Sequence, residues 1–181
     1  MLKKKLEKGL IQVYTGDGKG KTTAALGQAL RAVGGGYSVF MVQFLKGGPS
    51  GELISAKKLE PDFCIFRFEK ERGFFQTLND QQRMELKGEI NEALAFIKRV
   101  LTGEECNILI LDEVMGIIHS GLVSTEEICN ILSLKPDSME VILTGRNVPK
   151  AIEDMADLVT EMRMVKHPFN NGTGARQGIE W

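Results

Sequence analysis

The chain of 181 residues contains few of the residues that build disulfide frameworks and zinc sites. Its three cysteines, Cys64, Cys106 and Cys129, are far apart and form no CxxC pair, and its two histidines, His119 and His167, have no partner at metal-ligand spacing. An odd number of widely spaced cysteines argues against a disulfide scaffold and against structural zinc. We expect a reducing, cytoplasmic environment, with Cys64 and Cys129 buried and Cys106 at the edge of an apolar run.

The sequence also lacks a strong charge of one sign and any long apolar run. Its net charge is −1, so no overall field attracts nucleic acid or a membrane surface. No segment reaches the ~18 consecutive apolar residues that a membrane span requires. The one basic cluster lies in residues 1–8, with no signal-peptide core after it. We interpret it as a short solvated terminus before a single domain over residues 9–181.

Apolar strand patterns alternate with helical patterns along the chain. We predict strands over 10–14, 37–44, 63–68, 107–111, 139–143 and 158–165. Helices are predicted from 20 to about 34, over 52–59, from a cap at Asn79 to about 101, over 113–119, after a capping box at Ser124 and Glu127, and after Pro149. This order predicts an α/β fold of three layers, a mostly parallel sheet flanked by helices. The carboxyl ends of parallel strands share one edge, where such sheets bind ligands.

A glycine-rich loop follows the first strand and precedes the first helix. Residues 15–23 read TGDGKGKTT, which ends like the phosphate-binding pattern GxxxxGK[ST] but has Thr15 where that pattern starts with glycine. Gly16, Gly18 and Gly20 let backbone amides turn toward an anion, and the following helix adds its positive end. We therefore predict a P-loop of nucleotide-binding architecture. Its candidate ligands are Thr15, Gly16, Asp17, Gly18, Lys19, Gly20, Lys21, Thr22 and Thr23, with Lys21 on phosphate oxygens.

Two further groups follow strands and should lie near this loop. Asp112 and Glu113 end the strand 107–111, so they are candidates, with Thr22, for holding Mg²⁺ or Mn²⁺ directly or through water. Glu113 is equally suited to polarise a water molecule, and a plain acidic helix start remains the alternative for both. Arg146 follows the fifth strand and can pair with phosphate. We expect His119 to be structural.

These segments together resemble the ATP:corrinoid adenosyltransferases of the P-loop type. The matching stretches lie in order along almost the whole chain: VYTGDGKGKTTAA (13–25), VQFLKG (42–47), LDEV (111–114), VILTGR (141–146), ADLVTEM (156–162), VKHPF (165–169) and ARQGIEW (175–181). The substitution of Thr15 for glycine belongs to the pattern of that family. The resemblance implies a RecA-like P-loop fold and a homodimer.

The resemblance also implies a reaction. Cobalt(I) of a reduced corrinoid attacks the 5′ carbon of ATP, triphosphate leaves, and a cobalt–carbon bond forms. Lys21, Lys19 and the metal would stabilise the leaving triphosphate electrostatically. A flavin-type reductase or flavodoxin is the implied source of electrons. The alternatives that the loop alone leaves open are another P-loop enzyme, such as a nucleoside kinase or an ATPase, and a nucleotide-binding regulator.

In the family a hydrophobic loop beneath the corrin displaces the lower axial ligand of cobalt and so eases its reduction. The matching stretch here is Gly73 to Gln76, which makes Phe74 a catalytic candidate and makes Phe74, Phe75 and Gln76 corrinoid-binding candidates. Gln76 stands where many relatives have tryptophan, and Asp17 stands where asparagine is common. The first strand also begins only about nine residues into the chain, whereas some relatives carry a longer N-terminal segment over the corrin.

Overall fold

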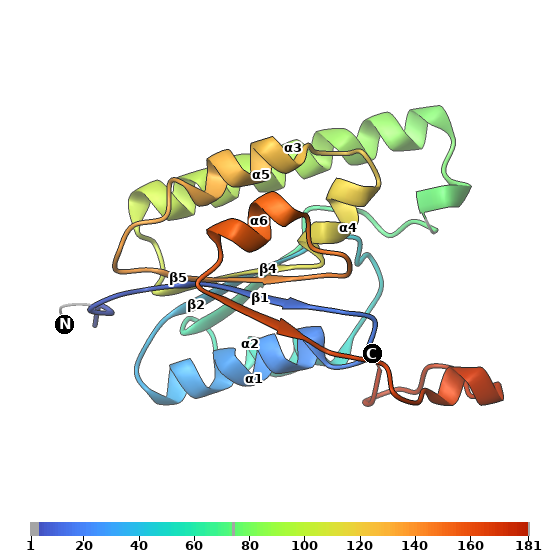
Figure 1. Ribbon diagram of the computed structural model, residues 1–181, viewed down its shortest axis with the longest axis horizontal. Coiled ribbons are helices and arrows are strands. Elements are labelled where there is room, and N and C mark those ends of the chain that lie inside the picture. Colours follow the sequence, from blue (N-terminus) through green and yellow to red (C-terminus); the bar gives the residue numbers. More distant parts are fainter. Residues whose placement is uncertain (1–3, 74, 181) are drawn as a thin grey trace.

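The computed structural model describes residues 4–73 and 75–180 and contains a six-stranded parallel sheet (Figure 1). The strands lie side by side in the order β3-β2-β4-β5-β1-β6. Every pairing is parallel, so all carboxyl ends point to one edge of the sheet. The strands are β1 (Ile11–Thr15), β2 (Val39–Gln43), β3 (Phe63–Phe66), β4 (Ile108–Asp112), β5 (Glu140–Thr144) and β6 (Leu158–Glu161).

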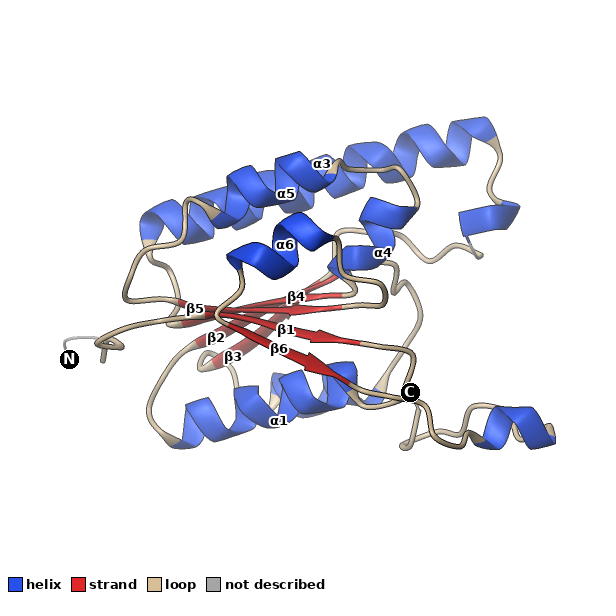
Figure 2. Ribbon diagram, viewed as in Figure 1, coloured by secondary structure: helices blue, strands red, loops and turns tan. Residues whose placement is uncertain are grey.

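Helices cover both faces of the sheet, as predicted (Figure 2). One face carries α1 (Lys21–Gly34) and α2 (Gly51–Lys57). The other carries α3 (Asp80–Gly103), α4 (Val114–His119), α5 (Thr125–Leu132) and α6 (Lys150–Met155). Two 3-10 turns, η1 (Phe75–Thr77) and η2 (Pro168–Asn171), lie in the loops after β3 and after β6. No described helix combines the length and the apolar character needed to cross a bilayer.

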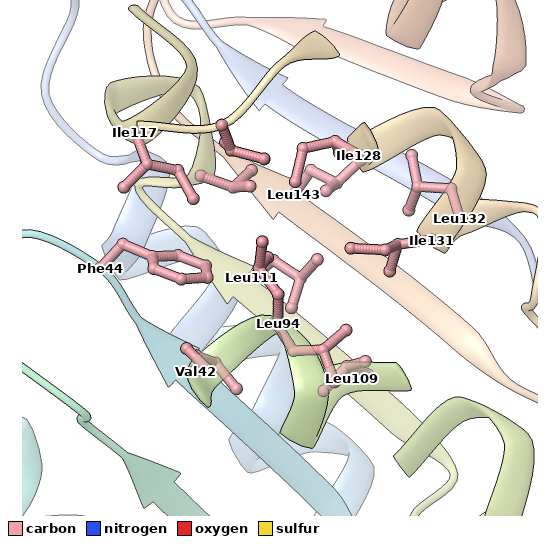
Figure 3. Close-up of a cluster of buried hydrophobic side chains, with 14 of the residues drawn as sticks. Val42, Phe44, Leu94, Leu109, Leu111, Ile117, Ile128, Ile131, Leu132 and Leu143 are labelled. Atoms are coloured by element: carbon pink, nitrogen blue, oxygen red, sulfur yellow. The ribbon is translucent and has the colours of Figure 1, made fainter. Parts of the chain in front are cut away.

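The two faces are packed with side chains of different size. On the α1 face, Ala25, Ala29 and Ala32 are buried against β-strand residues such as Met41 and Ile110. Small side chains bring the helix close to the sheet and fix its first turn relative to β1. The opposite face holds the larger apolar core that Figure 3 shows, built from branched and aromatic side chains of β2, α3, β4, α5 and β5.

The long helix α3 has well-defined ends. The Asn79 side chain accepts a hydrogen bond from the backbone N–H of Gln82, and the Gln82 side chain accepts one from the backbone N–H of Asn79. These two bonds form a capping box. The other end stops at Glu104 in a left-handed conformation. The amino-terminal end of α3 projects beyond the carboxyl edge of the strands (Figure 1). Leu86 of α3 lines the cavity described below.

The structure shortens three predicted strands at their ends. Strands form only over Val39–Gln43, Phe63–Phe66 and Leu158–Glu161, within the patterns over 37–44, 63–68 and 158–165. The sixth strand lies at the edge of the sheet, pairs only with β1, and leaves all four of its residues exposed. Apolar residues beyond it, such as Val165, have no second strand to extend the ladder.

The prediction for the cysteines was wrong. Cys106 is buried, whereas Cys64 and Cys129 are only partly buried. Cys64 lies on β3, an edge strand, and Cys129 lies beside the buried stripe of α5. The apolar residues next to them in the sequence therefore predicted more burial than the structure gives.

Two lysines of the basic cluster in residues 1–8 contact the domain. Lys4 donates to the carbonyl oxygen of Gly35 at 2.9 Å, and Lys5 pairs with Glu104 at 2.6 Å.

Candidate functional site

The glycine-rich loop joins β1 to α1 at the carboxyl edge of the sheet. Its glycines are needed because the chain after β6 passes very close to the loop. The Gly18 amide donates to the Met162 carbonyl oxygen at 2.6 Å, and a Cβ atom on Gly16 or Gly18 would lie 2.5 or 2.6 Å from that same oxygen. Gly20, immediately before α1, has φ 123°, a conformation that favours glycine. Contacts with the chain after β6 therefore fix the shape of the loop.

Lys21 lies in the middle of this loop. Its ammonium donates hydrogen bonds to the carbonyl oxygens of Gly16 and Gly18, at 2.7 and 2.8 Å. Burial lowers the pKa of Lys21 below its ordinary value, and the positive charge of Arg146 lowers it further, while Glu113 and Asp17 act in the opposite direction. Within the part of the chain that the structure describes, the ammonium has carbonyl partners rather than a carboxylate partner, so its charge remains available to an anion.

Asp112, at the end of β4, is the centre of the second group of polar side chains. It is fully buried, and its Oδ1 accepts from the hydroxyls of Thr22 at 2.8 Å and Thr144 at 2.7 Å. Its Oδ2 accepts from Lys46 at 2.7 Å and from the amide of Gln43 at 3.1 Å. Four strand-end segments thus meet at one carboxylate, as expected for the carboxyl edge of a parallel sheet.

A further layer of contacts links Asp112 to the loop after β2. Arg67 donates through Nε to the side-chain oxygen Oε1 of Gln43 at 2.8 Å, and through its terminal nitrogens to the Gly48 carbonyl oxygen and the Ser50 hydroxyl. The Gln43 amide therefore connects a carboxylate on one side with a guanidinium on the other. This chain of hydrogen bonds fixes the loop 45–50 relative to β4.

Thr22 and Asp112 present the chemistry that a magnesium site requires. A hydroxyl oxygen and a buried carboxylate lie 2.8 Å apart at the start of the helix after the phosphate loop, and hard divalent cations prefer such oxygen ligands. Glu113 adjoins them, with its backbone amide fixed by the Thr144 hydroxyl at 2.9 Å. Within the described residues no cluster of three or more carboxylate, histidine or cysteine ligands occurs. The residues fit an ion that takes its other ligands from phosphate and water, not a fully protein-bound metal.

Lys19 meets the C-terminal tail. Its ammonium donates to the Ile179 carbonyl oxygen at 2.9 Å and to the Glu180 carboxylate at 2.8 Å. Arg176 and Lys19 both lower the pKa of Glu180, to about 2. A cavity of about 420 Å³ beside Gly18 and Lys19 has a strongly basic lining that includes Arg163, Lys166, His167 and Arg176. The tail thus adds cationic groups to the phosphate loop.

A larger cavity of about 680 Å³ lies beside α3, where Leu86 lines it. Its walls come from the loop after β2, the loop between β3 and α3, and the end of α4. Phe75 and Gln76 both line it, and Phe75 also packs under the guanidinium of Arg83, 5.2 Å from the ring centre. Phe74 lies outside the described residues. Glu180 lines both cavities, so the two adjoin at that side chain.

Arg146 follows β5, and His119, the last residue of α4, contacts the same turn. The exposed Arg146 is close enough to Lys21 to lower its pKa. His119 places Nε2 2.9 Å from the Asn147 carbonyl oxygen and 3.3 Å from that of Arg146. Because both partners are carbonyl oxygens, Nε2 must carry the ring hydrogen and donate it. His119 thereby holds the turn that carries Arg146. That contact agrees with the structural role predicted for it.

The structure brings most of the predicted nucleotide and metal residues to one edge, but with different surroundings. Lys21, Thr22, Asp112 and Glu113 lie around the loop, whereas Thr23 is exposed on α1 and Thr15 is buried in β1. Position at a strand end predicts Gln43 and Thr144 at this edge, and Lys46 near the substrate, but it does not predict their contacts with Asp112. Sequence reasoning missed Arg67 and Glu180. Arg67 directly follows β3, which is the signal that would have found it, whereas Glu180 had no such signal.

Comparison with known proteins agrees with this geometry. A profile of the family described as ATP:corrinoid adenosyltransferase BtuR/CobO/CobP matches residues 7–181. The corrinoid adenosyltransferase of Escherichia coli K12 is 39% identical over 97% of this chain and 87% of its own length. Corrinoid adenosyltransferase CobA of Salmonella typhimurium is also 39% identical, and the Pseudomonas aeruginosa relative is 32% identical over 97% of this chain and 85% of its own length.

Solved structures support the predicted architecture. Flagellar accessory protein FlaH of Methanocaldococcus jannaschii superimposes with a TM-score of 0.57 at 14% identity, over 86% of this chain and 72% of its own. A KaiC-like protein of Pyrococcus horikoshii superimposes with a TM-score of 0.54 at 20% identity, over 86% of this chain and 74% of its own. Identities this low carry the fold alone. The parallel sheet with helices on both faces is therefore the RecA-like P-loop arrangement.

Proposed function

This chain belongs to the ATP:corrinoid adenosyltransferase family, and we propose that its phosphate loop and the adjoining cavity carry out the transfer. The enzyme transfers the adenosyl group of ATP to a reduced corrinoid. Cobalt(I) supplies an electron pair that forms the bond to the 5′ carbon, the bond from that carbon to the triphosphate oxygen breaks, and triphosphate leaves with the electron pair of the broken bond. Cobalt ends formally as cobalt(III), and no proton needs to move.

The observation that supports this assignment is the position of Lys21. Its ammonium is held by two loop carbonyls, with no carboxylate partner among the described residues, beside Arg146. A leaving triphosphate gains negative charge as the carbon–oxygen bond breaks, so fixed cations at this place stabilise the transition state more than the bound substrate. Lys21 is therefore assigned to the phosphates, with Lys19 beside it and Arg146 at the rim. The backbone amide of Gly18 is engaged by the Met162 carbonyl oxygen, so the loop amides on either side of it are assigned to complete the anion site.

Thr22 and Asp112 are assigned to Mg²⁺ or Mn²⁺, with Glu113 as an outer neighbour. The ion would neutralise phosphate charge when it is bound with ATP. Thr22 offers its hydroxyl, while Asp112, already in contact with Thr144 and Gln43, is oriented by them. A ligand held by outer contacts of this kind keeps one orientation.

The larger cavity is assigned to the corrinoid. It adjoins the nucleotide residues at Lys46, and its lining combines the aromatic ring of Phe75 with polar groups such as Gln76 and Arg67. A macrocycle with apolar faces and an amide periphery requires that combination. Phe74 is assigned to the lower face of the corrin by the family resemblance. A homodimer, a flavin-type reductase or flavodoxin as electron donor, and a cytoplasmic location complete the proposal.

One assay separates this function from the alternatives. The protein is supplied with ATP, Mg²⁺ and a chemically reduced corrinoid, and the products are identified. Triphosphate together with a light-sensitive adenosylcorrinoid is the expected result. ADP formed without a corrinoid would instead indicate a kinase or an ATPase, and ATP binding without turnover in either mixture would indicate a regulator.

A further inference from the structure

Lys46 occupies a position between the two oxygen ligands assigned to the metal. Its ammonium lies 2.7 Å from Asp112 Oδ2 and 3.4 Å from Thr22 Oγ1. Among the described side chains that are hydrogen-bonded to Asp112, only Lys46 carries a charge, because the others are two threonines and a glutamine. Lys46 is therefore the charged partner in direct contact with the buried carboxylate, and the charge of Arg67 acts on it from behind the Gln43 side chain.

A buried carboxylate needs such a partner. Asp112 is 0% exposed, and an unpaired charge at that depth is costly. A divalent ion beside Thr22 Oγ1 and Asp112 would supply the same compensation, and two cations cannot share these oxygens without strong repulsion. Lys46 and the metal are thus alternatives at one place.

The Lys46 side chain also has space to move away from Asp112. Its side chain is 29% exposed and lines the larger cavity, so the ammonium can leave Asp112 without crossing the core. Its backbone, in contrast, is held. Leu45 has φ 55°, and its amide donates to both carboxylate oxygens of Glu69, at 2.8 and 3.0 Å. Motion is therefore confined to the long side chain.

We propose that Lys46 is a resident counter-ion that keeps the divalent ion out of the site until ATP delivers it. The proposal rests on the metal site assigned above. Without nucleotide, an incoming ion must displace a paired ammonium for only two protein ligands. With ATP, the phosphates offer the ion further oxygens and offer Lys46 a new anionic partner. Metal binding is thereby made dependent on nucleotide, and the empty enzyme holds no ion near the corrinoid.

The test is a Mn²⁺ titration of the full chain without nucleotide, in which free Mn²⁺ is read from its six-line electron paramagnetic resonance signal. We expect Lys46→Met and Lys46→Gln to bind Mn²⁺ at least about tenfold more tightly than the unmodified protein, since each removes the competing charge. Lys46→Arg, which keeps the charge, should bind like the unmodified protein. Lys70→Met is the matched control, because Lys70 lines the same cavity without contacting Asp112.

Asp112→Asn in the Lys46→Met background should abolish the gain. Equal Mn²⁺ affinity in the unmodified protein and in both neutral Lys46 variants would overturn the proposal, as would a gain that survives Asp112→Asn. The metal site itself is tested separately by the same titration with ATP present. If Asp112→Asn and Thr22→Ala leave Mn²⁺ binding with ATP unchanged, the site assigned under the proposed function is wrong, whatever Lys46 does.

Discussion

The carboxylate of Glu180 accepts a hydrogen bond from the ammonium of Lys19 at 2.8 Å, which ties the last described residue of the chain to the phosphate loop. The tail therefore places a negative charge on a cation that the nucleotide needs. Arg176, four residues earlier in the same tail, binds the same carboxylate, so Glu180 keeps an ion-pair partner when the Lys19 contact is exchanged.

Replacing Glu180 with glutamine should tighten ATP binding severalfold, because the phosphates no longer compete with a carboxylate for Lys19. Isothermal titration calorimetry of the Glu180→Gln variant with ATP measures the change in affinity. Glu92→Gln, on the exposed side of α3, is the matched control. The pKa of Glu180 is about 2, so the carboxylate stays ionised and the gain should be constant between pH 6 and 8. Unchanged or weaker ATP affinity would show that Glu180 does not compete.

Removing the Lys21 ammonium should lower kcat/KM by at least about 100-fold, because the charge is needed both for ATP binding and for departure of triphosphate. Lys21→Ala is compared with Lys57→Ala, an exposed lysine on α2 that should change kcat/KM by less than about twofold. A folded Lys21→Ala enzyme with normal activity would remove the basis for the phosphate-loop assignment.

Phe74→Ala should reduce turnover more when cobalt(II) and a mild reductant are supplied than when cobalt(I) is formed beforehand, since the family resemblance assigns this ring to ligand displacement before reduction. Phe75→Ala serves for comparison, because Phe75 lines the cavity and packs against Arg83. The measurement is the rate of adenosylcorrinoid formation under both conditions. Equal losses under both conditions would mean that the Phe74 ring contributes only to packing.

Glu69→Gln should stabilise the fold at neutral pH. Burial raises the pKa of Glu69, and Glu89 raises it further, against the effect of the Leu45 amide. A carboxyl whose pKa is raised on folding destabilises the folded state above that raised value, and the penalty disappears as the pH falls below the ordinary value near 4.5. If the penalty is about 1 kcal/mol, Tm rises by about 2–4 °C at pH 7.

The gain should shrink in acid, and thermal melting at pH 7 and pH 4 measures both values. Glu71→Gln removes a charge from an exposed neighbour and controls for the overall change of charge. A lower Tm at pH 7 would indicate that the bidentate contact with Leu45 outweighs the cost of burying the charge.

Element order and the phosphate loop could be predicted because they depend on local pattern. The alternation of apolar strands with helices indicated a parallel sheet, and the strand before TGDGKGKTT and the helix after it identified the loop. The limits of β6 could not be predicted in this way, because they depend on whether a neighbouring strand exists. Cys64 shows the same limit, since its burial is set by its place on an edge strand.

The contacts that join distant residues across the site also could not be predicted from the sequence. Asp112 was recognised from the strand that it ends, but nothing local indicates that a lysine 66 residues away contacts it. The contact of Lys19 with Glu180 spans 161 residues and depends on the path of the tail after η2. Contacts of this kind follow from the strand order, which brings distant strand ends to one edge.

The hydrogen bond from Gly18 to Met162 has a consequence for the dynamics of the protein. Met162 directly follows β6, the outermost and most exposed strand, so the phosphate loop shares the opening free energy of the least protected part of the sheet. The Gly18 amide should exchange with solvent deuterium whenever that edge opens. A nucleotide that orders the loop would slow exchange along β6 as well, and so protect a strand that it never touches.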